Sequence, residues 1–354
     1  MNLRKFFNLI TFGVCVSQHS HAAVVNIPES MYTPKYTLEE ILYPKASPFN
    51  EGHLSVSEVH KIWYAEFGNP KGVPVIFIHG GPGAGTFEND MRFFDPEYYH
   101  IILFDQRGSG KSLPFGELKD NNTQNLIEDI DKLRKHLKVD KWFVFGGSWG
   151  SALAMLYGET YPENCHGFVL RGIYLGTKPE YEQLWYGMKD IFPEYWEEMA
   201  NYIPESERDD LIKAYYKRLT SSDPKIQEEA AGYFMKYDAL ASYLFDSREK
   251  VSRILLDEDK LVLGCSKLFT HYSINKFFLS HDQIIKNIGK INHLPAYIIH
   301  GRYDVICRAE QAYRLHKNWP NSHLTFVQDA GHASTEIGIA KALVDATNKM
   351  KKVL

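Results

Sequence analysis

A serine lies at the centre of the strongest chemical motif in the chain, Gly146-Gly147-Ser148-Trp149-Gly150. An apolar run over 142–145 precedes the motif and a helix-like run over 152–159 follows it, so the sequence predicts a strand, a sharp turn and a helix. In that setting G-x-S-x-G holds a serine on a strained turn with its hydroxyl exposed to a substrate. Larger side chains at 146 and 150 would collide with the turn. Ser148 is therefore predicted to be a nucleophile rather than an idle serine at a glycine-rich helix start.

Two further residues have the types and the chain order expected of a proton relay for this serine. A serine hydroxyl becomes a good nucleophile when a base removes its proton, and here the expected order is Ser, then Asp, then His. Asp304 follows the apolar run that starts at 296, and His332 follows the run 324–327. Since carboxyl ends of parallel strands share one edge of an open sheet, we expect Asp304 to orient His332 and His332 to carry the proton. His300 and His323 lack this placement and are predicted to be structural.

A second glycine-rich segment could stabilise the negative charge that acyl transfer develops. His79-Gly80-Gly81-Pro82-Gly83 follows the apolar run 73–78. The backbone N–H groups of Gly81 and Trp149 are the expected oxyanion-hole donors. Nucleotide binding is disfavoured, because no G-x-G-x-x-G register fits 80–88 and Asp105 stands where a P-loop needs glycine. No H-E-x-x-H or paired-cysteine spacing predicts a metal site.

Short apolar runs along the chain predict the strands that must position these residues. Continuous runs of this length are typical of parallel strands covered on both faces. They lie at 73–78, 101–104, 142–145, 167–170, 296–299 and 324–327. Helical patterns, such as the apolar face over 124–137, lie between several of them, which predicts a doubly wound α/β fold with a mostly parallel sheet. The alternating segment 53–70, ended by Asn69-Pro70, predicts a hairpin.

The stretch 175–290 interrupts this alternation of strands and helices. It is rich in Trp, Tyr, Glu and Lys and has the pattern of successive helices. Asp223-Pro224 predicts the start of one of them, with Asp as the N-cap and Pro at the first helical position. We therefore expect a helical cap domain over 175–290, inserted into a core made of 23–174 and 291–354.

The composition is that of an ordinary globular protein. The 354 residues include 40 Lys and Arg against 44 Asp and Glu, which gives a formal net charge of −4. Hydrophobic residues make up 44% and charged residues 24%, so the chain has enough apolar mass for a large core and is not expected to be disordered. The weak negative balance argues against broad electrostatic binding to nucleic acid.

The first 22 residues predict a secretory signal peptide. A short basic start precedes a largely apolar run over 6–16, and Ser20-His21-Ala22 offers small residues for cleavage before Ala23. The apolar run is too short to span a bilayer, which disfavours a permanent anchor. We expect export to the periplasm or the medium and no stable association with a membrane.

Cleavage at that point would remove Cys15 and leave three of the four cysteines, Cys165, Cys265 and Cys307. Three cysteines are too few for a disulfide framework. Three buried thiols are expected, and one bridge with one free thiol is the alternative.

Five short segments carry a more specific pattern. They are His79-Gly80-Gly81-Pro82-Gly83, Asp105-Gln106-Arg107-Gly108-Ser109-Gly110, Gly146-Gly147-Ser148-Trp149-Gly150-Ser151, Leu170-Arg171-Gly172-Ile173 and Gly301-Arg302-Tyr303-Asp304. Together they resemble the proline iminopeptidase (prolyl aminopeptidase) family, from about residue 35 to the C-terminus. The resemblance implies an α/β-hydrolase fold with a helical cap and a Ser148, Asp304 and His332 triad. It also implies that the substrates are short peptides with a free N-terminal proline, and that no cofactor takes part.

The resemblance further implies that acidic side chains of the cap recognise the free amino terminus. Asp238 stands at the position of one family glutamate, whereas Phe269 replaces a second one. One anion fewer should weaken capture of the amine and could admit other substrates. Tyr174 and Trp185 are expected to line the proline pocket, because flat rings suit a pyrrolidine. An alternative is that Asp238 is a solvated helix carboxylate and that the two rings belong to the core.

Three functions remain open at this point. The first is a serine aminopeptidase that prefers N-terminal proline. The second, motivated by Phe269, is an esterase or a broader peptidase on the same machinery. The third is a binding protein that has kept a hydrolase fold, which the complete triad argues against.

Overall fold

The computed structural model describes residues 35–244 and 259–354. The predicted signal peptide over 1–22 lies outside the described residues, as does the stretch 245–258 of the predicted cap. Within the described ranges, no helix combines the length and the apolar character that crossing a bilayer requires.

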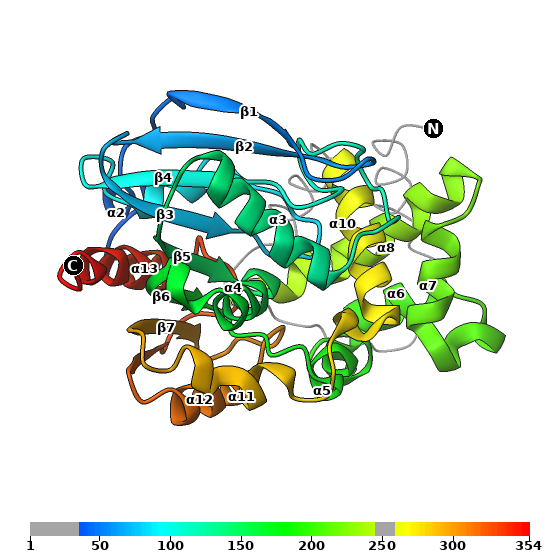
Figure 1. The fold of residues 1–354 in the computed structure, drawn as a ribbon. Helices are drawn as coiled ribbons and strands as arrows, with labels where there is room; N and C mark the ends of the chain where they lie inside the picture. The colour runs from blue at the N-terminus through cyan, green and yellow to red at the C-terminus, as the bar shows by residue number, and fades with distance from the viewer. Residues whose placement is uncertain (1–34, 245–258) are drawn as a thin grey trace.

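Eight strands of the described chain form one sheet in the order β1-β2-β4-β3-β5-β6-β7-β8 (Figure 1). Their bounds are β1 Asn50–Ser55, β2 Lys61–Gly68, β3 Val73–Ile78, β4 Tyr99–Phe104, β5 Trp142–Gly147, β6 Cys165–Arg171, β7 Ala296–Gly301 and β8 Ser322–Val327. β2 pairs antiparallel with β1 and with β4, and all other pairs are parallel. The six predicted apolar runs are thus the parallel strands β3 to β8.

The predicted hairpin is formed by β1 and β2, which turn over 56–60. The Asn69-Pro70 break falls after this hairpin and instead connects β2 to β3. Alternation therefore located the two strands, whereas the break marked the end of the second one.

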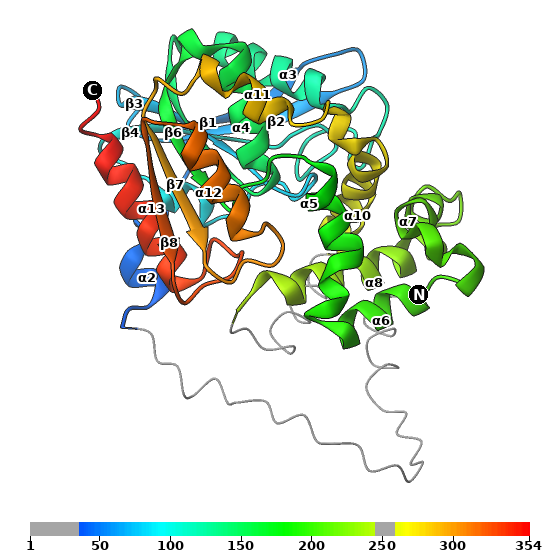
Figure 2. The same ribbon diagram turned by 90° about the horizontal axis from the view of Figure 1, so that it is seen from below.

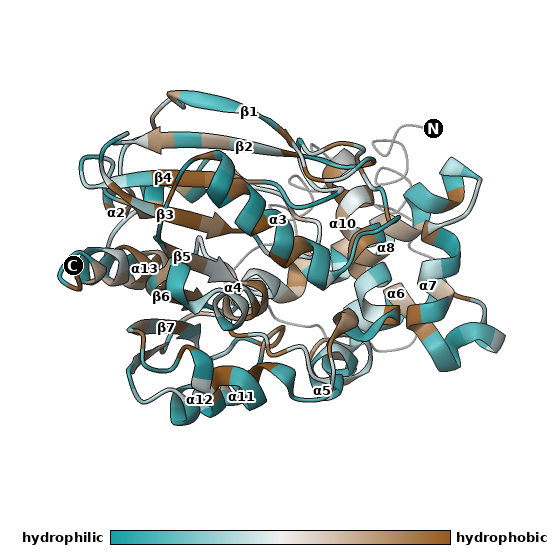
Figure 3. Cartoon of the chain, viewed as in Figure 1, coloured by the Kyte–Doolittle hydropathy of each residue, from teal (hydrophilic) through white to brown (hydrophobic). Residues whose placement is uncertain are grey.

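Side chains of each central strand alternate between the two faces of the sheet, as the pleat requires. In β3, Ile76 and Ile78 pack with α3 (Thr123–His136), α4 (Trp149–Thr160), α11 (Gln283–Asn287) and α12 (Ala309–Asn318). Val75 and Phe77 face the opposite layer, which contains α2 (Leu38–Ile41) and α13 (Ile337–Met350). Figure 2 shows these two helical layers from below, and Figure 3 shows apolar residues concentrated in the strands between them. The doubly wound α/β prediction is confirmed.

The described part of the region between β6 and β7 is helical. It contains α5 (Lys178–Glu182), α6 (Pro193–Asn201), α7 (Leu211–Leu219), α8 (Pro224–Ser242) and α10 (Asp259–Ile274), followed by α11. Asp223 caps α8 by accepting a hydrogen bond from the N–H of Lys225 at 2.9 Å. Residues of α6, α7, α8 and α10 share a separate hydrophobic cluster built around Trp185 and Phe234, and these helices lie together beside the sheet (Figure 1). The last helix, α11, packs back onto α4 of the core.

The three cysteines outside the predicted signal peptide are free and buried. This confirms the expectation of three buried thiols.

Candidate active site

Ser148 lies on the turn that joins β5 to α4. Its backbone has a φ of 58° and a ψ of −129°, a left-handed region that costs a residue with a side chain on the order of 1–3 kcal/mol. The N–H of Ser148 donates to the Arg171 carbonyl at 2.9 Å, which ties the turn to the end of β6. A Cβ added at Gly146 would lie 2.2 Å from the Gly150 carbonyl oxygen. The strained turn therefore needs glycine at 146, because any side chain there would collide with the backbone of Gly150.

Asp304 and His332 meet beyond the ends of β7 and β8. The Nδ1 atom of His332 lies 2.7 Å from Oδ2 of Asp304, whose other oxygen accepts the Cys307 N–H at 2.8 Å. Burial alone would raise the pKa of Asp304, but His332, His300 and the Cys307 N–H together hold it below its usual value. Asp304 is therefore anionic at neutral pH. It accepts the Nδ1–H of His332, which fixes the tautomer in which Nε2 carries no proton, as a base requires.

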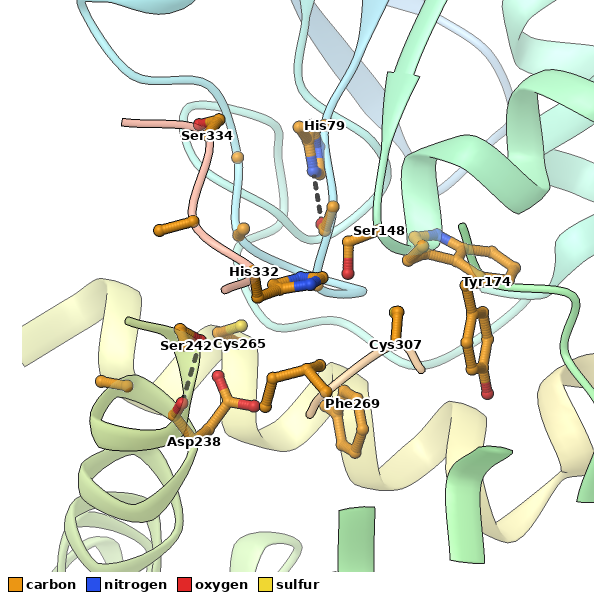
Figure 4. Close-up of a pocket in the computed structure, with 18 of the residues that line it drawn as sticks. His79, Ser148, Tyr174, Asp238, Ser242, Cys265, Phe269, Cys307, His332 and Ser334 are labelled. Carbon is orange, nitrogen blue, oxygen red and sulfur yellow. Dashed lines mark hydrogen bonds between the residues drawn. The ribbon is translucent and has the colours of Figure 1, made fainter. Parts of the chain in front are cut away.

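The Nε2 atom of His332 faces a guanidinium in this resting arrangement. Nη1 of Arg171 lies 3.2 Å from Nε2 and donates to the His332 carbonyl at 2.9 Å. No hydrogen bond joins His332 to the Ser148 hydroxyl in the described chain, although Figure 4 shows the two side chains adjacent. Catalytic hydrogen bonds are often long before a substrate is bound, so the absence of this bond is compatible with the predicted role of His332 as the base.

The two histidines predicted to be structural differ in their distance from this relay, because Nε2 of His300 lies 3.6 Å from Oδ2 of Asp304 whereas His323 has no contact with it in the described chain. His300 is fully buried, accepts the Ile173 N–H at Nδ1 and contacts the Cys307 carbonyl through Nε2. His323 is exposed and stacks on Tyr297.

The expected oxyanion donors both border the space in front of Ser148. Trp149 is the first residue of α4, so its N–H has no partner within the helix. Gly81 has a φ of +107°, a conformation that favours glycine. A Cβ added at the preceding Gly80 would lie 3.1 Å from Cβ of Ser148, so this loop passes directly beside the nucleophile.

A cavity of about 470 Å³ opens in front of Ser148, between the core and the cap. Its lining is mostly apolar and includes aromatic residues of both parts. Among the lining residues are Phe77, Phe87, Phe93, Ser148, Trp149, Arg171, Tyr174, Tyr181, Phe234, Asp238, Ser242, Cys265, Phe269, Phe277, Cys307, His332 and Ser334. In Figure 4, Asp238 and Phe269 lie on one side of the Ser148 and His332 pair, and His79 and Ser334 lie on the other. The cavity therefore extends to both sides of the nucleophile.

Asp238 points its carboxylate into this cavity from α8 (Figure 4). Burial raises its pKa to about 6, with nearby His332 acting in the opposite direction. The carboxylate accepts no hydrogen bond from the described residues, whereas the Asp238 carbonyl accepts the Ser242 hydroxyl at 2.9 Å. Asp238 is half-buried, and a partly desolvated carboxylate without a hydrogen-bond partner is stabilised by a cationic ligand. The solvated-helix alternative does not fit this placement.

The two predicted ring contacts differ in position. Tyr174 lines the cavity and packs edge-on against Phe277 at 5.0 Å between ring centroids. Trp185 is fully buried and stacks on Phe234, with 4.9 Å between the ring centroids. Phe234 lines the cavity and Trp185 does not. Trp185 is therefore a core residue of the cap, and the prediction that it lines the pocket is wrong.

Phe269 lines the cavity where the resemblance implies a second carboxylate. Its ring packs against that of Phe234, with 5.2 Å between the ring centroids, and continues the apolar wall of the cavity. Glu180 also borders the cavity, but both of its oxygens cap α5 by accepting from Leu175 and Thr177. Glu182 pairs with Lys178 at 3.1 Å and is partly exposed. Among the described lining residues, Asp238 is thus the carboxylate best placed for an amine at the cap side.

Sequence reasoning missed the contacts that attach the cap to the triad. The Ser242 carbonyl, at the end of α8, accepts the N–H groups of His332 and Ala333 at 3.0 and 2.9 Å. Glu336 accepts from Gly331 at 2.7 Å and from Leu244 at 3.0 Å, which bridges the histidine loop and the segment after α8. No sequence signal marks a backbone carbonyl as functional, so these contacts required the tertiary structure.

A thiol next to the nucleophile was also missed. Cys307 lines the cavity beside Ser148 (Figure 4), and burial raises its pKa well above the usual value. The thiol is therefore neutral and does not compete with Ser148 as a nucleophile.

No group of three or more His, Cys, Asp or Glu side chains is placed to hold a metal ion among residues 35–244 and 259–354.

Comparison with solved structures places this architecture among α/β hydrolases. A proline iminopeptidase-related protein from Thermus thermophilus superposes with a TM-score of 0.58 at 17% identity, covering 86% of this chain and 98% of that chain. An esterase from Exiguobacterium antarcticum gives 0.57 at 17% identity, with coverages of 85% and 100%. At these identities the likeness concerns the fold alone.

Sequence relatives are much closer. A probable proline iminopeptidase of Leptolyngbya boryana is 46% identical over 87% of this chain and 96% of that protein. The proline iminopeptidase of Arabidopsis thaliana is 46% identical over 88% of this chain and 83% of that protein, and that of Xylella fastidiosa is 40% identical over 87% and 98%. Residues 73–338 also match the family described as "alpha/beta hydrolase fold". The chain belongs to the proline iminopeptidase family of α/β hydrolases.

Proposed function

We propose that this protein is a serine aminopeptidase that releases N-terminal proline from short peptides. The observation that carries the proposal is the carboxylate of Asp238, aimed into an otherwise largely apolar cavity that also contains Ser148 and His332. A proline at a peptide N-terminus combines a cationic secondary amine with an apolar ring. The cavity offers the Asp238 carboxylate for the amine and aromatic walls for the ring.

The free amine fixes the orientation of the substrate. An ion pair with Asp238 holds the proline ring on the cap side, near Phe269 and Tyr174. The carbonyl carbon then lies towards Ser148, and the rest of the peptide leaves on the opposite side, past Ser334. Acetylation removes the positive charge, so an acetylated substrate would leave Asp238 desolvated and unpaired, which costs binding free energy.

Acyl transfer then follows from the relay. Ser148 Oγ attacks the proline carbonyl while His332 Nε2 takes its proton and Asp304 stabilises the resulting imidazolium. The N–H groups of Gly81 and Trp149 stabilise the oxyanion. Collapse breaks the peptide bond, and His332 returns the proton to the leaving amine. A water activated by His332 hydrolyses the prolyl ester, releasing proline and regenerating Ser148.

The proposal is tested with purified protein and four chromogenic substrates: a Pro amide, its N-acetylated form, an Ala amide and a short acyl ester. We expect the free Pro amide to give the highest kcat/KM, and acetylation to reduce it by at least about tenfold, since an unpaired buried charge costs about 1–3 kcal/mol or more. Ser148→Ala should abolish turnover while the far-UV circular dichroism is unchanged. Turnover retained in that variant, or an acetylated substrate cleaved as fast as the free one, would contradict the proposal.

A second candidate function is a hydrolase of acyl esters or of a wider range of peptides. Phe269 supports it, because an apolar wall replaces the carboxylate that would hold the amine from a second side. In that case the acyl ester would be the best of the four substrates, and acetylation of the Pro amide would be harmless.

We further propose that the protein is exported and that residues 1–22 are removed on the way. The basic start, the apolar run over 6–16 and the small residues before Ala23 support this. The test is expression of the full chain in a bacterial host, followed by fractionation and N-terminal sequencing. We expect the extracytoplasmic form to begin at Ala23, and an unprocessed chain found only in the cytoplasm would overturn the proposal.

A further inference from the structure

Three neighbouring strands end beside the nucleophile, and buried side chains connect the segments that follow them. In the sheet, β3 lies between β4 and β5. Gln106 follows β4, His79 follows β3, and Trp149 follows β5 after Ser148. The exposed fractions of Gln106, His79 and Trp149 are only 2%, 2% and 1%. Polar groups buried this deeply must find partners within the protein.

The Gln106 side chain links the other two segments directly. Its Nε2 donates to the His79 carbonyl at 2.7 Å, and its Oε1 accepts the indole N–H of Trp149 at 3.0 Å. An indole N–H can only donate and a carbonyl oxygen can only accept, so the amide has one permitted orientation. Gln106 therefore sets the distance between the loop after β3 and the first residue of α4.

The His79 ring controls the orientation of the next peptide group. Its Nε2 accepts the backbone N–H of Gln106 at 2.9 Å, so the proton is on Nδ1. Nδ1–H then donates to the Gly80 carbonyl at 2.9 Å, the bond that Figure 4 draws as a dashed line below His79. Because a trans peptide directs its C=O and N–H in opposite directions, holding the Gly80 oxygen on the His79 side aims the Gly81 N–H away from it.

We infer that Gln106 and His79 are positioning residues that preorganise both backbone donors of the oxyanion hole. His79 fixes the peptide that carries the Gly81 N–H, and Gln106 fixes Trp149 relative to it. The inference rests on the proposed acyl-transfer function of Ser148. Donors fixed in advance need no reorganisation when charge develops, so this connection contributes to the transition state and not to binding of the ground-state substrate.

The test is Gln106→Met, which keeps the length of the side chain and removes both hydrogen bonds. Loss of a whole oxyanion donor typically costs about 10²–10³ in kcat, so displacement of the donors should lower kcat by about tenfold to a hundredfold. KM for the Pro amide and inhibition by free proline should stay unchanged, since neither depends on the oxyanion. Trp149→Phe, which removes the indole N–H together with part of the buried ring, should lower kcat in the same direction and give a second variant if Gln106→Met folds poorly.

A separate readout uses the rate at which a fluorophosphonate reacts with Ser148. This reaction develops charge on an oxygen in the same hole but needs no proline recognition. We expect its rate constant to fall with kcat in both variants. If wild-type protein reacts with the probe yet does not cleave Pro amides, the proposed substrate is wrong while the positioning role is still measured.

The matched control is Gln311→Met, because Gln311 is also buried, at 3% exposure, but lies in α12 outside the cavity. We expect it to change thermal stability without changing kcat or the phosphonylation rate. A rise in KM with constant kcat in Gln106→Met would overturn the inference. So would an unchanged phosphonylation rate, or an equal loss of kcat in the control.

Discussion

At the scale of single residues, the site depends on two carboxylates near His332, Asp304 and Asp238, whose pKa values are shifted in opposite directions. His332 and the Cys307 N–H hold the pKa of Asp304 below its usual value despite burial, so this group stays anionic and orients the base. Burial without a hydrogen-bond donor raises the pKa of Asp238 to about 6. Pairs of titratable groups with divergent pKa values often mark separate roles in one mechanism. Under the proposed function, Asp304 belongs to the relay and Asp238 to recognition of the substrate.

The pH dependence of substrate capture follows from Asp238. Below about pH 6 its carboxyl is protonated and can no longer pair with a cationic amine, so kcat/KM for the Pro amide should fall as the pH decreases through that value. Asp238→Asn should raise KM for the Pro amide by at least about tenfold at pH 8, because an ion-paired hydrogen bond contributes about 1.5–3 kcal/mol. The measurement is kcat/KM from pH 4.5 to 9 for the Pro amide and the acyl ester.

The ester serves as the internal comparison because it carries no amine. The decrease in its kcat/KM at low pH therefore depends on the relay alone. Asp238→Asn should leave the ester profile unchanged, and Asp190→Asn, at a position outside the cavity, should affect neither substrate. If Asp238→Asn loses both activities equally, Asp238 acts on the relay and not on the amine.

At the scale of elements, much of the site could be predicted from the sequence because its residues follow directly from strands. Each apolar run located a strand, and Ser148, Asp304 and His332 come just after three of them. Strands β5, β6 and β7 continue to Gly147, Arg171 and Gly301, residues that no apolar pattern includes. Contacts between distant segments, such as Arg171 with His332 or Ser242 with His332, depend on how the elements pack and leave no periodic signal.

The attachment of the cap to the triad also predicts an effect at this scale. Glu336 uses both carboxylate oxygens to accept N–H groups from Gly331 and Leu244. Glu336→Gln replaces one acceptor by an NH₂ group, which cannot accept. We expect a loss of about 1–3 kcal/mol in the free energy of unfolding and a severalfold lower kcat, because the loop that carries His332 is held less firmly. Denaturant unfolding and steady-state kinetics measure the two effects.

Glu310→Gln is the control for Glu336→Gln, since Glu310 is exposed and lies in α12. We expect no change in kcat or in stability from this substitution. An unaltered free energy of unfolding in Glu336→Gln would show that the two hydrogen bonds do not attach the cap to the core.

At the scale of the whole molecule, two hydrophobic layers around the sheet and a third cluster in the cap bury most of the large side chains. Charged groups enclosed by these layers affect global stability through their pKa values. Burial raises the pKa of Glu159 to about 8, and the charge of Lys290 offsets only part of this rise. Burial also raises the pKa of Asp90 to about 7, and the Phe87 N–H and the charge of Arg171 offset only part of that rise. These groups bind protons in the folded protein at pH values where the unfolded chain has released them. Their ionisation therefore makes the fold less stable as the pH rises.

The sign of this effect gives a prediction for Glu159, which lies in α4 outside the cavity and is 5% exposed. Between the unfolded pKa near 4.5 and the folded value of about 8, the folded state holds the extra proton, so stability decreases as the pH rises through this window. Glu159→Gln keeps the shape and removes the ionisation. We expect it to raise the free energy of unfolding at pH 8.5 by on the order of a few kcal/mol, and to have little effect at pH 4.5. Denaturant unfolding at both pH values measures this, with the exposed Glu163→Gln as the control. Equal effects of Glu159→Gln at the two pH values would mean that hydrogen bonding, and not the buried charge, determines the contribution of this residue.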